Sequence, residues 1–289
     1  MLYQLSYTPP ARERGGHSGG GGGAQEAVNA GAAPRLRYGG KAMARLDPDL
    51  LLRAYSVGVF PMANSRDARD VFWVEPKRRG VLPLDGFHLS RSLAKTLRSG
   101  RFTLTADAAF AQVVARCAEP TPVRPDTWIN PQIEKAYGEL HARGYAHSIE
   151  TWEEGRLVGG LYGVRLGAAF FGESMFSRVR DASKVALAHL VARLKVGGFR
   201  LLDCQFQTDH LASMGAVEIA RQDYVGLLDE ALGLGAPAVG GDTTAASGAA
   251  DFFALDALAA GSTVGVADAA TVSGPVSACF IAQLLGHTS

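Results

Sequence analysis

The stretch YAHSIETWEEGRLVGGLYGVRLGAAFFGESMF, residues 145–176, contains the pattern that decides the fold. Within it, residues 145–152, 156–166 and 168–176 have the length and apolar content of β-strands. Glu154-Gly155 and Leu166-Gly167 separate these segments and supply residues typical of tight turns. The stretch therefore predicts three consecutive strands that form a β-meander.

The segments after the meander are predicted to alternate between helix and strand. In order, we expect a helix from Asp181, its N-cap, to Gly197-Gly198, a strand FRLLDCQ, a short helix HLASMG, a strand AVEIA and a helix that begins near Asp223. A meander followed by helix, strand, helix and strand is typical of an α+β domain with a mixed sheet. We assign this domain to residues 127–234.

The segments before the meander predict a smaller N-terminal α/β domain, residues 44–126. Asp47 and Pro48 suit the N-cap and first position of a helix. A helix ending at Gly100, a strand FTLTA and a helix with Asp107 as its N-cap follow. A further helix, which opens at Asn130-Pro131 and runs to Gly144, connects this region to the meander.

Two regions outside these domains have a different composition. Residues 1–43 are rich in Gly, Ala and Arg and are expected to be a disordered tail. Residues 235–289 form an Ala/Gly-rich, low-complexity C-terminal extension. Within this extension we expect one helix at 251–260, and the final GPVSACFIAQLLGHTS is apolar enough to dock on the domain.

Overall composition excludes several classes of protein. The chain has 289 residues, and its formal charge of +1 argues against indiscriminate coating of nucleic acid but allows a local basic face. Three cysteines without paired spacing, Cys117, Cys204 and Cys279, favour a reducing compartment. The sequence has no apolar run of membrane-spanning length and no signal-peptide core. We therefore expect a cytoplasmic protein without a membrane partner.

Polar residues end the apolar segment Leu201-Leu202. Because side chains alternate along a strand, Asp203 and Gln205 share one face and Cys204 points to the other. Asp203 could simply cap the next turn, and Cys204 is more often a small buried residue than a nucleophile. A nucleophilic pair of Cys204 with His210 is conceivable, but alternation would separate it from Asp203.

A second carboxylate, Glu173, follows an apolar run. Burial of such a group is unfavourable unless it is paired, and Arg178 or Arg180 could pair with it in a purely structural role. The alternative places Glu173 near the end of the Asp203 strand. The helix between them carries an apolar stripe that forms core by default but could also wall a pocket: Leu187, Leu190, Val191 and Leu194.

Ten short motifs together resemble the leucyl/phenylalanyl-tRNA–protein transferase family, from about Leu46 to about Leu232. Each motif is weak alone, but their order and spacing are specific. They are GVFP, HLSRSL, TWI, HSIE, LVGGLYGV, FFGESMFSR, ASKVAL, LLDCQ, DHLASMGA and RQDY. The resemblance implies a GNAT-like fold for the larger domain. It also implies transfer of Leu or Phe, and Met less well, from aminoacyl-tRNA to the N-terminus of an acceptor protein, which is thereby marked for degradation.

The same resemblance implies the residues of the active site. Asp203 and Gln205 occupy the family's catalytic Asp-x-Gln positions, where Asp203 would orient the attacking amine and share its proton. Glu173 matches a motif glutamate that helps to hold the ammonium group or to organise the site. Six apolar positions match the pocket for the aminoacyl side chain: Leu161, Phe170, Met175, Leu187, Leu190 and Leu194.

The RNA-binding residues also follow from the resemblance. Trp128 matches a tryptophan that stacks on the terminal adenosine. The family commonly has a second tryptophan after GxFP, and this chain has Met62 there, which stacks less well on a base. Arg91, Lys95 and Arg98 recur on one helix face that suits the acceptor stem, although an ordinary solvated face would look the same.

The resemblance implies no metal and no organic cofactor, because the aminoacyl ester is already activated, and it implies acceptors that begin with Arg or Lys. An acyl-CoA-dependent GNAT enzyme is disfavoured, since the junction FSRVRDASK lacks the Gly-rich pyrophosphate loop. A non-catalytic module that binds a tRNA end or a degron is disfavoured by the intact set of three polar residues. Residues 44–234 contain every matched motif and are expected to suffice for activity.

Overall fold

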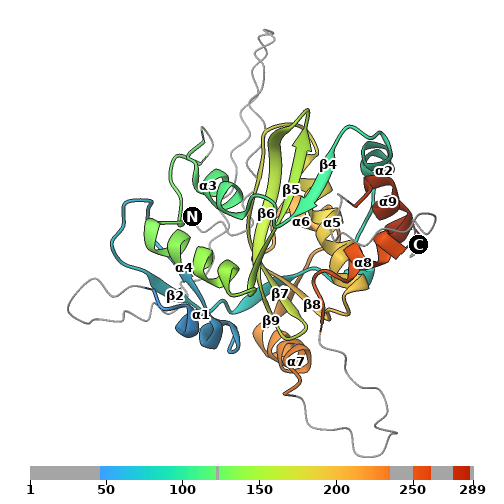
Figure 1. The fold of residues 1–289 in the computed structure, drawn as a ribbon. Helices are drawn as coiled ribbons and strands as arrows, with labels where there is room; N and C mark the ends of the chain where they lie inside the picture. Colours follow the sequence, from blue (N-terminus) through green and yellow to red (C-terminus); the bar gives the residue numbers. More distant parts are fainter. Residues whose placement is uncertain (1–45, 122–123, 235–249, 262–275, 287–289) are drawn as a thin grey trace, which may run out of the picture.

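A seven-stranded mixed sheet organises the computed structural model, which describes residues 46–121, 124–234, 250–261 and 276–286. Figure 1 shows the sheet at the centre of the molecule. In spatial order its strands are β4 (Thr103–Ala106), β5 (Ala146–Glu153), β6 (Arg156–Leu166), β7 (Ala169–Ser177), β8 (Leu201–Gln205), β3 (Arg78–Val81) and β9 (Val217–Ala220). The expected α+β class with a mixed sheet is confirmed.

The predicted meander is present as β5, β6 and β7, which pair antiparallel in sequence order. Gly155 and Gly167 in its two turns both adopt positive φ angles, of 73° and 57°, which glycine tolerates without a steric penalty. β8 then pairs parallel with β7 after the crossover through α5 (Ala182–Val196). This pairing covers only residues 169–171 and 201–203, so the two strands part just before Glu173.

Strands from the N-terminal part of the chain complete this sheet. β4 pairs with β5, and β3, which has no counterpart among the predicted elements, lies between β8 and β9. The boundary drawn at residue 126 thus separates strands of a single sheet. A small second sheet pairs β1 (Phe60–Met62) with β2 (Phe72–Val74).

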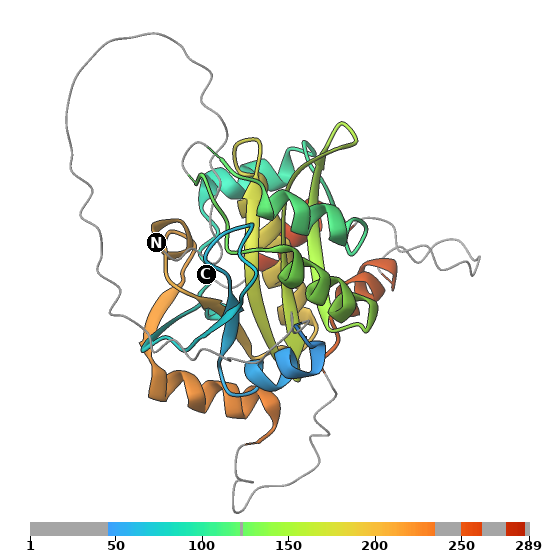
Figure 2. The same ribbon diagram turned by 90° about the vertical axis from the view of Figure 1, so that its left-hand side faces the viewer.

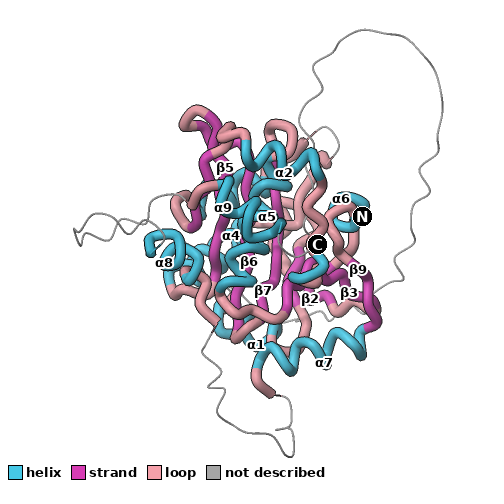
Figure 3. Tube along the Cα trace, turned by 90° about the vertical axis from the view of Figure 1, so that its right-hand side faces the viewer, coloured by secondary structure: helices cyan, strands magenta, loops and turns pink. Residues whose placement is uncertain are grey.

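Helices cover both faces of the large sheet (Figures 1 and 2). One face carries α1 (Pro48–Tyr55), α3 (Phe110–Ala118), α4 (Pro131–Ala142) and α7 (Arg221–Leu232). The other carries α5, α2 (Arg91–Arg98), α8 (Ala254–Gly261) and α9 (Ala278–Gly286), as Figure 3 shows. The short η1 (Leu84–Gly86) and α6 (Asp209–Ala212) complete the described elements. Each face therefore has its own hydrophobic cluster.

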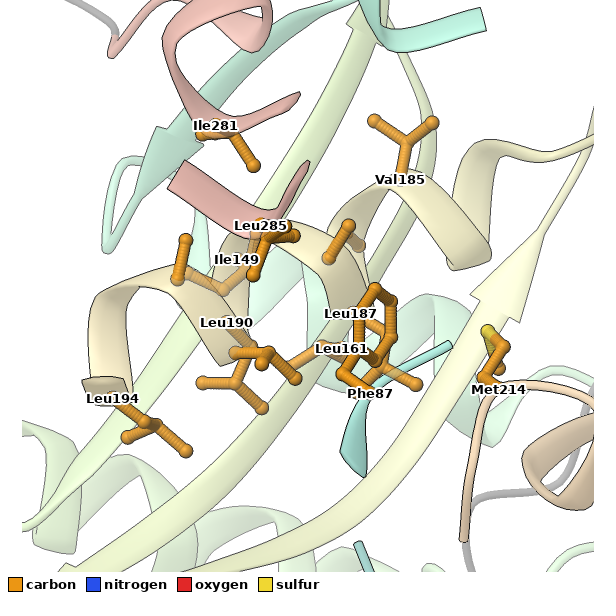
Figure 4. Close-up of a cluster of buried hydrophobic side chains, with 14 of the residues drawn as sticks. Phe87, Ile149, Leu161, Val185, Leu187, Leu190, Leu194, Met214, Ile281 and Leu285 are labelled. Carbon is orange, nitrogen blue, oxygen red and sulfur yellow. The ribbon is translucent and has the colours of Figure 1, made fainter. Parts of the chain in front are cut away.

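The C-terminal extension contributes to the cluster around α5. The expected helix near 251–260 is present as α8, and the terminal apolar segment docks as α9. Phe252, Leu255, Ile281 and Leu285 are all buried. Figure 4 shows Ile281 and Leu285 in one cluster with side chains of α5. The expectation of a docked segment is confirmed, and the described parts of the extension, residues 250–261 and 276–286, pack on the domain.

Some expectations need correction or lie outside the described residues. Asp107 is not the N-cap of α3, because the helix begins at Phe110 and the Glu150 carboxylate accepts from the backbone N–H groups of Ala108 and Ala109. The tail at 1–43 and the segments 235–249 and 262–275 are not described. None of the described helices has the length and apolar character of a membrane span.

Candidate active site

Glu173 lies in a buried polar cluster where β7 and β8 part. The register between β6 and β7 passes from Tyr162↔Ser174 to Gly163↔Gly172, so Glu173 is an extra residue in β7. Such a bulge re-aims a side chain, and here the Glu173 carboxylate turns toward α1 and α4. Its Oε1 accepts from Tyr55 at 2.8 Å and from Gln205 Nε2 at 3.0 Å, while Oε2 accepts from Tyr137 at 2.9 Å.

Burial controls the protonation of Glu173. Removal from water raises its pKa to about 7, and the hydrogen bonds from Tyr55 and Tyr137 oppose this shift only partly. The two tyrosine hydroxyls also contact each other. The Glu173 carboxyl group can therefore take up and release a proton near neutral pH.

Asp203 is completely enclosed by hydrogen-bond donors. Arg79 contacts both of its carboxylate oxygens, with Nη2 to Oδ2 at 2.6 Å and Nε to Oδ1 at 2.9 Å. The Tyr224 hydroxyl donates to Oδ2 and the backbone N–H of Gln205 donates to Oδ1, each at 2.8 Å. Asp203 has a relative exposure of 0%. An incoming amine would have to displace one of these donors to reach the carboxylate.

Gln205 has a buried side-chain oxygen without a partner among the described residues. Its backbone adopts a left-handed φ of 57°, which is uncommon for a residue with a side chain and concentrates at functional sites. Its Nε2 donates to Glu173, whereas its buried Oε1 has no hydrogen-bond partner among the described residues. Because an unpaired buried carbonyl is unfavourable, this oxygen suits a donor on a substrate.

The three residues expected to be catalytic therefore lie together on one face of the sheet. The alternation argument is confirmed, since Asp203 and Gln205 face this cluster and Cys204 lies in the hydrophobic cluster behind it. Arg178 and Arg180 instead pair with Glu119 and Asp181. Burial raises the pKa of the Cys204 thiol, which disfavours a thiolate nucleophile.

The six expected pocket residues lie in one cluster on the opposite face, with α5. All six are buried: Leu161, Phe170, Met175, Leu187, Leu190 and Leu194. Their cluster also contains residues of α8 and α9, and Phe170 stacks on Phe252 with ring centroids 5.7 Å apart. Met175 is two residues from Glu173 on β7, and the bulge at Glu173 places the two side chains on opposite faces of the sheet.

The two residues expected to stack on the terminal adenosine are neighbours but are buried. The backbone N–H of Ala63, next to Met62, donates to the Trp128 carbonyl. Trp128 is 5% exposed and Met62 is 2% exposed, so neither presents a free face for a base in this conformation. The Trp128 Nε1–H is buried, and the described part of the chain offers it no acceptor. Stacking would require this segment to open.

The expected basic face on α2 is present. Arg91, Lys95 and Arg98 are exposed, while Leu93, Ala94 and Leu97 bury the opposite side of the helix. A cavity of about 210 Å³ lies between α2, β4 and the start of α9, and Arg98 is among its lining residues. It is lined by none of the three polar residues described above, so we do not assign the reaction to it.

Four residues of the polar cluster escaped sequence reasoning: Tyr55, Tyr137, Arg79 and Tyr224. Tyr55 and Tyr137 lie on the buried sides of amphipathic helices, where an aromatic residue is expected to pack in the core. Arg79 belongs to the charged run Lys77-Arg78-Arg79, which is typical of a solvated surface. Only Tyr224 lies in one of the family motifs, RQDY, and that motif by itself indicates no role for it.

Comparison with known proteins gives the family. The family model described as leucyl/phenylalanyl-tRNA protein transferase matches residues 81–229, and the model of the N-terminal domain of that transferase matches residues 44–77. The chain belongs to the leucyl/phenylalanyl-tRNA protein transferase family. Membership of this family makes it an aminoacyltransferase, and the predicted family and enzyme class are confirmed.

Individual transferases are similar over most of their length. A leucyl/phenylalanyl-tRNA–protein transferase of Rhizorhabdus wittichii is 68% identical over 253 residues, which cover 86% of this chain and 100% of the relative. The transferase of Zymomonas mobilis is 68% identical over 65% of this chain and 70% of its own length. That of Novosphingobium aromaticivorans is 54% identical over 81% of this chain and 85% of its own length.

Proposed function

We propose that this transferase moves Leu or Phe, and Met less well, from aminoacyl-tRNA to the N-terminal α-amine of an acceptor protein. We further propose acceptors that begin with Arg or Lys and that are marked for degradation by the added residue. The names of the similar proteins support the donor. Dependence on charged tRNA supports a cytoplasmic location.

The reaction balances without a further reactant. The neutral α-amine attacks the ester carbonyl carbon, a C–N bond forms, and the bond from that carbon to the ribose oxygen breaks. The amine loses a proton and the leaving ribose oxygen gains one. An unperturbed α-amine has a pKa of about 8, so part of it is neutral at physiological pH. The protein has to align two substrates and carry one proton between them.

The geometry supports a division of roles among the three polar residues. Gln205 Oε1 would accept a hydrogen bond from the attacking amine and orient it. Glu173, joined to Gln205 at 3.0 Å and with a pKa of about 7, would take the proton and return it to the leaving oxygen. Asp203 would act through Gln205 rather than on the amine, because its oxygens already accept from Arg79, Tyr224 and Gln205.

The observation that carries this proposal is the Gln205 carbonyl, which has no partner among the described residues, beside a carboxyl group with a pKa of about 7. For the aminoacyl side chain, we propose that it enters beside Met175, which lies two residues after Glu173 on β7 and belongs to the apolar cluster. We propose that Arg91, Lys95 and Arg98 contact the acceptor stem, and that Trp128 and Met62 receive the terminal adenosine once their segment opens.

The test uses the full chain, labelled Leu-tRNA and a peptide that begins with Arg. We expect label on the peptide α-amine, and none on the same peptide with an acetylated N-terminus. A peptide that begins with Asp tests the acceptor preference, and acetyl-CoA in place of Leu-tRNA tests the disfavoured acyl-CoA reaction. Transfer from acetyl-CoA, or retention of Leu-tRNA without any transfer, would overturn the proposal.

A further inference from the structure

We propose that Arg79 and Tyr224 are positioning residues, which clamp Asp203 so that it holds Gln205 in its left-handed conformation. The inference rests on the proposed role of Gln205, and it concerns two side chains that do not reach the substrate. Arg79 is a buried cation that takes no direct part in the proposed chemistry.

Arg79 is held on all sides. Its guanidinium group forms the two-pronged contact with Asp203, and its Nη1 donates to the Gly58 carbonyl at 2.8 Å. The guanidinium carbon lies 4.8 Å from the ring centroid of Phe60 and 4.4 Å from that of Tyr224. The arginine side chain is 2% exposed. The planar fork and the two rings leave Arg79 one orientation, and that orientation determines where Asp203 lies.

Tyr224 completes the clamp from α7. Its ring packs on Arg79, and its hydroxyl donates to Asp203 Oδ2, the oxygen that also accepts from Arg79 Nη2. Gly58 is required beneath this ring, because a Cβ there would lie 2.8 Å from Tyr224 Cε1. The carboxylate therefore has two anchors from different elements, β3 and α7, and cannot rotate without breaking both.

Asp203 passes this constraint to Gln205. Its Oδ1 accepts from the Gln205 backbone N–H at 2.8 Å, which stabilises the left-handed φ of 57°. The chain turns sharply after Gln205, and a Cβ on Gly80 would lie 2.6 Å from the Phe206 carbonyl carbon. β3 thus contributes an arginine that fixes the turn and a glycine that makes room for it. Without the clamp, relaxation of φ would swing Oε1 away from the amine.

The clamp also ties the segment before β1 to the site. Gly58, the acceptor of Arg79 Nη1, lies three residues after Tyr55, and Tyr55 donates to Glu173. One guanidinium group therefore sets the positions of both Gln205 and the α1 tyrosine. The contact joins residues matched by the family's N-terminal domain model to the strand end that carries Asp203.

The experiment compares Arg79→Lys and Tyr224→Phe with Arg193→Lys. Arg193 is a matched control, because it is equally buried and forms the same two-pronged contact, with Asp256 on the other face. We expect the single-turnover rate at saturating Leu-tRNA to fall about 10–100-fold for Arg79→Lys, the effect of losing one charged hydrogen bond. Tyr224→Phe removes a neutral donor and should lower the rate by up to about 10-fold.

The same clamp predicts four further results. Arg193→Lys should keep the wild-type rate, and the KM for Leu-tRNA should stay near the wild-type value in all three variants. In a Gln205→Ala background, Arg79→Lys should cause a much smaller loss than in the wild type, since only its contact through Gly58 toward Tyr55 remains. Amide hydrogen exchange at Gln205 should accelerate in Arg79→Lys and Tyr224→Phe but not in Arg193→Lys.

Hydrogen exchange separates this inference from the proposed function, because it needs no substrate. Faster exchange at Gln205 together with an unchanged transfer rate would keep the clamp and refute the role of Gln205. Unchanged exchange at Gln205 in a folded Arg79→Lys variant would overturn the clamp. Equal rate losses in Arg79→Lys and Arg193→Lys would also overturn it, because Arg79 would then be a purely structural residue.

Discussion

Two buried arginine–aspartate pairs, one on each face of the sheet, are built alike. Arg79 donates to both carboxylate oxygens of Asp203, with Nη2 to Oδ2 at 2.6 Å and Nε to Oδ1 at 2.9 Å. Arg193 donates to both carboxylate oxygens of Asp256, with Nη1 to Oδ2 at 2.6 Å and Nη2 to Oδ1 at 2.8 Å. Each guanidinium group also donates to a backbone carbonyl, of Gly58 or of Phe252. Each lies over two aromatic rings, Phe60 and Tyr224 in one pair and Phe252 and Phe253 in the other.

The pairs differ in what the carboxylate holds besides its arginine. Asp203 is fully buried and accepts two more hydrogen bonds, one of them from the backbone of Gln205. The Asp256 side chain is 18% exposed and lies on α8, so its pair joins α5 to the C-terminal extension. The same kind of ion pair therefore fastens a helix on one face and, in our proposal, positions Gln205 on the other.

The largest expected effect is a difference in transfer rate between the variants Asp203→Asn and Asp256→Asn. Asp203→Asn and Asp256→Asn each leave a buried arginine without its partner, so each should lower the free energy of unfolding by about 3–5 kcal/mol. Asp203→Asn should in addition lower single-turnover transfer by about 100-fold or more, because Gln205 then loses the carboxylate that positions it. Asp256→Asn should transfer at the wild-type rate.

Both rates are measured at a temperature where circular dichroism shows the two variants to be folded. Similar transfer rates for Asp203→Asn and Asp256→Asn would show that both ion pairs have a purely structural role. Cys204→Ala serves as the neighbouring control, because Cys204 faces the opposite cluster. Its transfer rate should match that of the wild type, and a dead Cys204→Ala variant would revive the thiol nucleophile.

The next effect concerns stability on the face that carries Arg193. Phe252 is fully buried and stacks on His147 and Phe170, so Phe252→Ala should lower the free energy of unfolding by about 3–5 kcal/mol. Truncation after residue 234 also removes Leu255, Ile281 and Leu285 from the core and should destabilise the chain further. Residues 44–234 are thus expected to be less stable than the full chain.

Urea unfolding of both variants checks this prediction, and transfer per folded molecule is measured beside it. Transfer should persist wherever the protein is folded, because the polar cluster lies on the other face. Loss of transfer by folded Phe252→Ala would show that the extension also shapes the aminoacyl pocket through Phe170.

A pH titration tests the face that carries Glu173. Its pKa rises from 4.5 to about 7 on folding, so the folded state holds this proton more tightly than the unfolded state. The stabilising contribution is complete below pH 4.5 and is lost as the pH rises toward about 7. At about 1.4 kcal/mol per pH unit, the loss is on the order of 3 kcal/mol.

Glu173→Gln should remove this dependence, because glutamine mimics the protonated carboxyl group and does not titrate. The measurement is the free energy of unfolding at pH 5, 6 and 7 for both proteins. The wild type should lose stability relative to Glu173→Gln across this range. A constant difference would show that Glu173 has the same protonation in the folded and unfolded states.

The smallest expected effect lies on the surface. Charge reversal at Arg91 and Lys95 should weaken binding of Leu-tRNA and reduce the slope of log affinity against log salt by about 1 for each phosphate that is no longer neutralised. The transfer rate at saturating Leu-tRNA should not change, because α2 packs on the opposite face of the sheet from the polar cluster. Charge reversal at the exposed Arg156 is the matched control. Equal slopes for all variants would assign α2 to ordinary solvent exposure.

The sequence alone determined those features that depend on neighbours in the chain. Turn residues around 154–155 and 166–167 separate segments of strand length, and these became the meander. A strand, a long helix and a second strand produced the parallel pair β7 and β8. Alternation correctly placed Asp203 and Gln205 on one side and Cys204 on the other. Periodicity and turn chemistry act over a few residues, so they can be read locally.

The tertiary structure alone decided which distant groups meet. Arg79 looks like part of a solvated charged run, yet it is buried against an aspartate 124 residues later in the chain. The bulge at Glu173, the position of β3 between β8 and β9, and the burial of Trp128 also left no mark in the local pattern. Burial and ion pairing depend on which surfaces come together in space. No period along the chain encodes that choice, because it is made by packing across the whole sheet.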